Sequence, residues 1–411
     1  MARTFQPLTV DDARYRRFSE SNTAFNALSR DRGSGWQQTF SRRQRDLAIN
    51  AKASPKETIA EREDALIQYA LIDAMDRINV MTADWGSGKC NRGGLKWEPA
   101  DGWFAEEGVE RPADAARLTR AVRFLGRDCG AVSTGVAPFD RRWIYSETQR
   151  NHCQPGEPDT QPILIDADGV PYEDEAGLHI PSTLSSVIVC AVPMHAGLIS
   201  SAPSLYSEAA TSQGYSLAAR VCLSLAEFCR SLGYQAIASL NGTALSVPIA
   251  VQAGLGEVGR NGMLITPEYG PCVRLCKVYT DMPLEQGAPR DLGIQAYCQV
   301  CGACARACPS HAIPSGDPTW EGANECNSAG VLKWHVNAKQ CLRYWVAAGS
   351  SCSACIAVCP FASGKGWFGG LPQRLIARTT RWNRIIAWLD RRWGVKRRRQ
   401  TSDQVTPEIM P

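Results

Sequence analysis

The longest apolar stretches of this sequence stay well below the roughly 18 residues that a membrane-spanning helix needs. Its 5 histidines are scattered, and none belongs to an H-E-x-x-H or other paired-histidine motif. No internal repeat is apparent outside two cysteine-rich runs. The sequence therefore gives no indication of a transmembrane protein or of a histidine-based zinc enzyme.

The N-terminal region also lacks the apolar core of an export signal. Arg16-Arg17-Phe18 is weakly similar to a twin-arginine motif, but the residues that follow it are polar. The chain as it stands is therefore expected to be cytoplasmic. A precursor whose leader had been removed would look the same.

The chain has 411 residues, of which 44% are hydrophobic and 21% charged, as in ordinary globular proteins of two or three domains. It contains 17 cysteines, and 8 of them fall in the two runs. The others show no regular disulfide spacing, so we predict that most are reduced and buried. These are Cys90, Cys129, Cys153, Cys190, Cys222, Cys229, Cys272, Cys276 and Cys326.

The two cysteine runs have the spacing of iron–sulfur ligands. The first, Cys298 to Pro309, fits the bacterial ferredoxin pattern C-x2-C-x2-C-x3-C-P, whose fourth cysteine binds the neighbouring cluster. The second contains Cys352 to Pro360, with Cys341 upstream. A zinc site is disfavoured, because zinc needs four ligands at one centre and no Cys-Pro.

This crossed pattern predicts two 4Fe-4S clusters, which we call cluster A and cluster B. The ligands predicted for cluster A are Cys298, Cys301, Cys304 and Cys359. Those predicted for cluster B are Cys308, Cys341, Cys352 and Cys355.

Strand-like and helix-like segments alternate through the middle of the chain, which indicates an α/β sandwich. Strands are predicted at 162–166, 186–192, 234–239 and 273–279, and helices at 24–28, 61–80, 112–127 and 215–232. Gly233 stands where a helix-ending glycine is expected. We divide the chain into an N-terminal arm (1–60), a central domain (61–290), a cluster domain (291–365) and a basic tail (366–411).

The basic tail has an amphipathic pattern. Residues 371–400 carry ten arginines or lysines against one acid, and no nucleic-acid motif accompanies them, so no nucleic-acid partner is predicted. Two interpretations remain: the apolar face lies in a membrane interface, or it packs on its own domain. The face comprises Leu375, Ile376, Trp382, Ile385, Ile386, Leu389 and Trp393.

Two further patterns bear on chemistry. Gly254-Leu-Gly-Glu-Val-Gly259 fits G-x-G-x-x-G, but no clean strand precedes it, so we favour a loop that closely approaches another large ligand. Tyr215 is expected in the first turn of its helix, where the dipole favours a phenolate. Beside Arg274 it would make a sensible acid, with Asn241 on a strand-end turn, although the residues alone favour a core tyrosine and a surface arginine.

The run from Gly254 to Gly270, the following Val273-Arg-Leu-Cys-Lys-Val278 and the paired cluster motifs together resemble corrinoid-dependent reductive dehalogenases. The resemblance implies a nitroreductase-like α/β sandwich that binds a corrinoid, followed by a two-cluster ferredoxin-like domain. The family leaves the lower cobalt face without a histidine (base-off), and a D-x-H-x-x-G motif is absent here. Cys272 stands where the family usually has arginine.

The resemblance also implies residue roles. Tyr215 matches the proton donor, Asn241 and Arg274 match its polar neighbours, and Thr211 and Trp345 match the substrate pocket. The corrinoid-binding loop would comprise Gly254, Gly256, Glu257, Gly259, Arg260, Asn261, Leu264, Thr266 and Tyr269.

The implied reaction removes halogen from a small organohalide, with electrons from an external low-potential donor. Two other functions remain open: a reductase similar to epoxyqueuosine reductase, and an iron–sulfur electron carrier without corrinoid. The missing export core argues against the exported, membrane-tethered role of respiratory members, and the tail leaves peripheral membrane contact open.

Overall fold

The computed structural model describes residues 8–32, 35–36, 39–40, 43, 111–149, 160–166, 171–174, 176–362 and 371–394. The helix predicted at 61–80, Cys90 and Cys153 lie outside these residues. The four-part domain division therefore stays a prediction.

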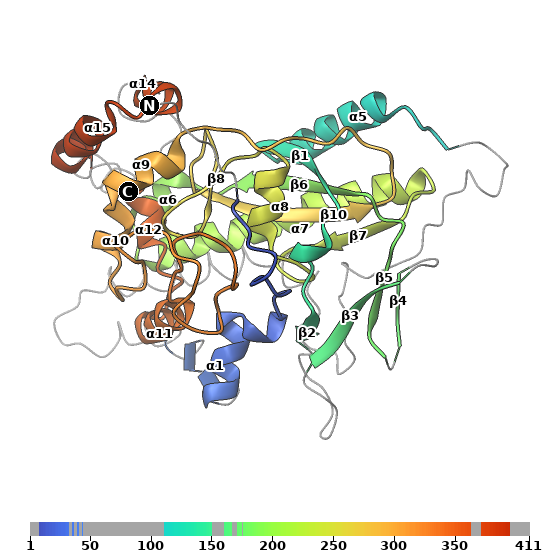
Figure 1. Ribbon diagram of the computed structural model, residues 1–411, viewed down its shortest axis with the longest axis horizontal. Coiled ribbons are helices and arrows are strands. Elements are labelled where there is room, and N and C mark those ends of the chain that lie inside the picture. Colours follow the sequence, from blue (N-terminus) through green and yellow to red (C-terminus); the bar gives the residue numbers. More distant parts are fainter. Residues whose placement is uncertain are drawn as a thin grey trace, which may run out of the picture.

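A four-stranded antiparallel sheet forms the centre of the molecule (Figure 1). Its strands, in spatial order, are β1 (Ser133–Pro138), β6 (Ser186–Pro193), β10 (Val273–Thr280) and β7 (Ala236–Ser239). The strands predicted at 186–192, 234–239 and 273–279 are thus confirmed.

Both faces of this sheet are covered, which explains why β6 is an uninterrupted apolar run. Alternate β6 residues such as Val189 pack with α8 (Ser246–Gln252). The residues between them, such as Ile188, pack with α5 (Ala115–Asp128) and α7 (Leu205–Ser231). The period-2 alternation of a strand therefore feeds two separate cores.

The long helix α7 begins ten residues earlier than the sequence predicted. Ser204 is its N-cap, its side chain accepting from the Ser207 backbone N–H in a capping box. The serine, threonine and glycine content of 205–214 hid this first part of the helix. Tyr215 therefore lies in mid-helix, so the expected dipole effect on it is wrong, whereas Gly233 follows the helix with φ +77° as predicted.

A second, smaller sheet has the order β2-β3-β5-β4. It comprises β2 (Glu147–Gln149), β3 (Thr160–Asp166), β5 (Leu178–Pro181) and β4 (Tyr172–Glu173). The His179 ring stacks on Tyr172 at 4.1 Å. Its Nδ1 lies 2.5 Å from Asp166 Oδ2, and its Nε2 lies 3.0 Å from Asp174 Oδ1.

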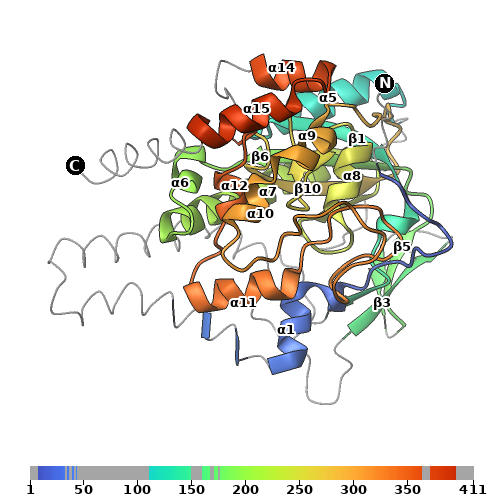
Figure 2. The ribbon, with the colours of Figure 1, turned by 60° about the vertical axis from the view of Figure 1, so that its left-hand side comes forward.

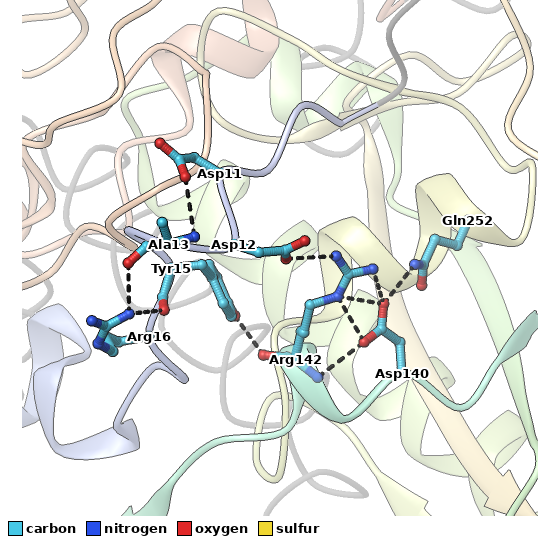
Figure 3. A network of polar contacts seen from close by, with 8 residues as sticks. All are labelled: Asp11, Asp12, Ala13, Tyr15, Arg16, Asp140, Arg142 and Gln252. Carbon is cyan, nitrogen blue, oxygen red and sulfur yellow. Dashed lines mark hydrogen bonds and ion pairs between the residues drawn. The ribbon is translucent and has the colours of Figure 1, made fainter.

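The N-terminal segment is tied to the central domain by a polar network (Figure 3). Arg142 forms ion pairs with Asp12 (3.3 Å) and Asp140 (2.8 Å), and its carbonyl accepts from the Tyr15 hydroxyl. Gln252 on α8 donates to Asp140 at 3.1 Å. The segment continues into the 3-10 helix η1 (Glu20–Asn22) and α1 (Ala24–Arg32), which packs against α11 (Ala338–Ala348).

The cluster domain is built from short helices around the cysteine runs. They are α9 (Ile294–Cys301), α10 (Ala303–Ala307), α11 (Ala338–Ala348) and α12 (Ala354–Ala357). The helix α6 (Ala196–Ser200) of the central domain packs against α12. A two-stranded ribbon, β8 (Glu257–Val258) with β9 (Leu264–Ile265), lies between this domain and the central sheet.

The tail forms two helices, α14 (Leu371–Arg378) and α15 (Asn383–Leu389), ending in a π-helical turn at Asp390–Gly394. Both pack on α9, burying Ile376 and Ala387 (Figure 2). The packing interpretation therefore holds for one face. Other large apolar side chains are about half exposed: Leu371, Trp382, Ile385 and Trp388. Among the described residues, no helix combines the length and apolar content needed to cross a bilayer.

The environment of His179 makes a pH-dependent contribution to stability. Burial lowers its pKa, but bonds to Asp166 and Asp174 outweigh burial, so the net pKa is raised. A raised folded-state pKa stabilises the fold fully below the ordinary value of about 6.5 and loses this effect as the pH rises through the folded value. We expect His179→Gln to cost more stability at about pH 6 than at about pH 9. Urea unfolding at both pH values measures this; an equal cost at both would contradict it.

Candidate functional site

The structure brings together four residues that the sequence assigned to the reaction site. The Asn241 side-chain amide donates to the Tyr215 hydroxyl at 3.0 Å. The Arg274 guanidinium lies 4.8 Å from the centre of the Tyr215 ring and donates to the Thr211 hydroxyl at 3.2 Å. Thr211 and Tyr215 share one face of α7 because they are four residues apart. Gly214 lets β10 approach, since a Cβ there would lie 2.9 Å from Arg274 Cγ.

The group formed by Tyr215, Asn241, Arg274 and Thr211 has the features of a proton-donating site. Asn241 is exposed and Tyr215 is partly exposed, so a bound molecule could reach the phenol. The cation stabilises the negative charge that a phenol acquires when it gives up its proton. Arg274 Nε is buried and has no hydrogen-bond partner in the described structure. Such orphaned donors are rare in proteins and call for an explanation.

Lys277, which sequence analysis missed, hydrogen-bonds to the turn that carries Asn241. Lys277 Nζ donates to the carbonyls of Leu240 (2.5 Å) and Gly242 (3.2 Å), on either side of Asn241. Lys277 is 1% exposed, and burial lowers its pKa to about 8. The available signal was a charged residue inside the strand β10, whose neighbours in sequence are buried.

Trp345, which was predicted to line the substrate pocket, lies apart from this group in the described contacts. It is on α11, where the centre of its ring lies 6.0 Å from that of Phe25. The Phe25 ring centre in turn lies 5.8 Å from that of Trp36. Its side chain also hydrogen-bonds to Cys341. Its pocket role stays a prediction.

The four cysteines predicted for cluster A line one cavity. Arg260, Asn261 and Tyr297 also line it, as does the backbone of the Gly259 loop. Burial first, and the neighbouring Cys301 next, raise the pKa of Cys304 to about 11. Bound iron would reverse this effect, because a metal ion stabilises thiolates. The donor set therefore fits an iron–sulfur cluster.

The four cysteines predicted for cluster B also gather together. The pKa of Cys341 is raised to about 12, first by burial and then by Cys352 and Cys308. The pKa of Cys355 is also raised, first by burial and then by the other three thiols together with Cys304. Cys304 belongs to the cluster A set, so the two sites are adjacent. In the described residues no three Cys, His, Asp or Glu side chains are placed to hold a single metal ion.

The glycine-rich loop makes close contacts, as its sequence predicted. Three of its glycines, however, make these contacts with the backbone of other residues of the protein. A Cβ on Gly254 would lie 2.6 Å from the Ala288 carbonyl oxygen, and one on Gly256 would lie 2.2 Å from that of Ile265. A Cβ on Gly270 would lie 2.4 Å from the Phe361 backbone. Gly270 therefore lets this loop pack on the cluster domain, whereas Gly254 and Gly256 let the central domain pack closely on itself.

Polar residues of this loop make further hydrogen bonds, both within the loop and to the cluster domain. Buried Glu257 accepts from the backbone N–H groups of Leu292 and Gln295 around the start of α9. The Thr266 hydroxyl donates to the Gly270 carbonyl at 3.1 Å. Of the other predicted corrinoid contacts, Gly259, Arg260 and Asn261 line the cluster A cavity, while Leu264 and Tyr269 pack into the adjoining core. Their contact with a corrinoid stays a prediction.

A packed path joins cluster B to the tyrosine. Cys355 and Ile356 lie in one apolar group with Met194 and Cys272. A Cβ on Gly214, the residue before Tyr215, would lie 3.0 Å from Met194 Cγ. Of the two predicted clusters, cluster B thus has described packing contacts that lead to the Tyr215 group.

Fold and site together define an iron–sulfur redox protein in which an accessible tyrosine cluster adjoins a dicluster domain. Residues 151–284 match the family described as "Reductive dehalogenase subunit", and residues 297–363 match "4Fe-4S dicluster domain". The chain belongs to the reductive dehalogenase family.

Known relatives agree with this assignment. The chain is 38% identical over 310 residues to tetrachloroethene reductive dehalogenase of Sulfurospirillum multivorans, covering 73% of this chain and 62% of that protein. It is 37% identical over 269 residues to that of Desulfitobacterium hafniense, covering 61% of this chain and 48% of that protein. The chain thus spans about half to three fifths of these relatives' length.

A solved reductive dehalogenase, described in terms of B12-dependent dehalogenation, superposes with a TM-score of 0.67. At 20% identity the match covers 97% of this chain and 49% of that one, and it shows the fold alone. The predicted fold, a mixed α/β unit followed by a ferredoxin-like dicluster domain, is confirmed.

Proposed function

We propose that this chain is an oxidoreductase that removes halogen from a small organohalide. The observation that carries the proposal is the convergence of Tyr215, Asn241 and Arg274 beside a chain segment leading to cluster B. The net reaction combines the organohalide, two electrons and one proton, and releases halide and the reduced organic product. Electrons would come from an external low-potential donor through the two clusters.

A bound corrinoid would give a partner to one polar group near Tyr215 that has none within the described protein. Arg274 Nε is a buried donor without a protein partner, beside a phenol that a bound molecule could reach. A base-off corrinoid would supply the electron transfer that breaks the carbon–halogen bond. The loop from Gly254 to Tyr269 would hold it, with Thr211 and Trp345 near the substrate.

The protein's own part is to hold and move a proton. Tyr215 Oη donates the proton to the carbon that loses halogen, and Arg274 stabilises the phenolate that remains. Asn241 orients the hydroxyl, and Lys277 fixes the turn on which Asn241 lies.

Two other functions account for less of this arrangement. An iron–sulfur carrier without corrinoid gives no task to the orphaned Arg274 donor or to the Tyr215 hydroxyl. A reductase similar to epoxyqueuosine reductase shares the cofactors. The loop from Gly254 to Gly270 and Asn241 favour dehalogenation over it. Reconstituted protein that retained iron but no cobalt would support the carrier.

Replacing Tyr215 with Phe tests the proton donor. We expect halide release to fall by about 10²- to 10⁴-fold, because general acid catalysis contributes about that much. The measurement is halide release from a halocarbon panel by reconstituted protein with a low-potential reductant. Tyr172→Phe, on the exposed sheet, is the matched control and should stay active. Full activity in Tyr215→Phe would exclude this role.

Replacing Cys341 with Ser tests the ligand set of cluster B. We expect iron content to fall from about eight to about four atoms per chain, because one 4Fe-4S cluster loses a ligand. Iron and acid-labile sulfide analysis measures this. Cys326→Ser changes a cysteine outside both sets and should leave the count unchanged. Retention of all the iron in Cys341→Ser would remove Cys341 from the set.

We also propose peripheral contact between α14–α15 and an anionic membrane. The half-exposed Leu371, Trp382, Ile385 and Trp388 are accompanied by exposed arginines, and Asp390, the single acid of 371–394, is buried. Tryptophan favours the membrane interface, and arginine favours anionic headgroups.

Vesicle flotation tests this contact. We expect binding to vesicles containing phosphatidylserine but not to phosphatidylcholine alone, with loss at high salt because the attraction is electrostatic. The double variant Trp382→Ser, Trp388→Ser should bind several-fold less. Absence of binding to the anionic vesicles would leave these helices as a docking face for an acidic protein instead.

A further inference from the structure

Arg260 is a buried cation on the wall of the cluster A cavity. It is 3% exposed, and its guanidinium donates to four backbone carbonyls of the cluster domain. Nε donates to Cys298 at 3.1 Å, and Nη1 donates to Pro314 and Gly316 at 2.8 Å each. Nη2 donates to Gln299 at 3.4 Å. The guanidinium carbon also lies 4.7 Å from the centre of the Trp334 ring.

None of these partners carries a charge. In the part of the chain that the structure describes, no ion pair joins Arg260 to a carboxylate. A buried charge without a counter-ion is costly, and a guanidinium keeps its charge in proteins. The negative groups that share its cavity are the four cluster A cysteines, as thiolates.

The two cluster sites differ in this respect. Arg260 acts electrostatically on Cys298 and Cys304 of the cluster A set. Arg260 also lines the cavity that the four cluster A cysteines share. Among the described hydrogen bonds, no arginine or lysine side chain donates to Cys308, Cys341, Cys352 or Cys355, whereas Arg260 donates to the carbonyl of Cys298.

We propose that Arg260 sets the reduction potential of cluster A above that of cluster B, so that cluster A takes the first electron. One-electron reduction adds negative charge to the cluster without breaking a bond, and a buried cation stabilises that charge. The external low-potential donor supplies the electron. Arg260 is thus a tuning residue of the electron entry site. This inference rests on the proposed ligand sets, not on dehalogenation.

The experiment is a redox titration of the two clusters by electron paramagnetic resonance in the purified holoprotein. Arg260→Gln removes the charge and keeps a hydrogen-bond donor, and we expect the higher of the two potentials to become lower. Arg260→Lys keeps the charge and should retain most of the original potential. Arg306→Gln is the matched control: Arg306 is exposed beside Gly302, so solvent screens its charge and little shift is expected.

Unchanged potentials in Arg260→Gln would overturn the proposal. A second measurement does not depend on the folding of that variant. In Cys341→Ser, cluster A alone is expected to remain, and its potential should match the higher wild-type value. A match to the lower value would overturn the proposal in the same way. Neither readout uses dehalogenation, so failure of the catalytic proposal would leave both results interpretable.

Discussion

The structure depends on how closely two backbones approach at the seam between the central domain and the cluster domain. Gly256 and Gly270 permit approaches that a Cβ would block, to Ile265 in the same loop and to Phe361 beside Cys359. Glu257 fixes the start of α9, which carries Cys298 and Cys301. A shift at this seam would displace the cluster A cavity relative to the central sheet.

Two buried cations without carboxylate partners in the described structure follow from this arrangement. Lys277 holds the carbonyls on either side of Asn241, and Arg260 holds carbonyls around Cys298. Apolar residues of similar size often stabilise a core better than buried charges. Their presence is therefore better explained by the backbone segments that they position, which carry Asn241 in one case and Cys298 in the other.

Local signals predicted most of the fold and the cluster cysteines. The spacing of Cys298 to Cys308 is a short-range pattern, and β6 is an apolar run whose burial needs no distant partner to be recognised. The start of α7 was missed because its first part is rich in small polar residues, and its capping box depends on side-chain geometry. Arg260 and Lys277 owe their roles to carbonyls far away in sequence, which no periodicity reveals.

The order of the two clusters along the chain has a physical consequence. Cluster A lies beside α9, on which the basic tail packs, and the Cys355 segment of cluster B packs on Met194 next to α7. Cys304 of one predicted set lies close enough to Cys355 of the other to act on it electrostatically. The cavity of the cluster A cysteines is also lined by Gly259, Arg260 and Asn261, which belong to the loop proposed to hold the corrinoid. The higher potential proposed for cluster A would make it the first of the two clusters to be reduced, because a buried cation stabilises the added electron.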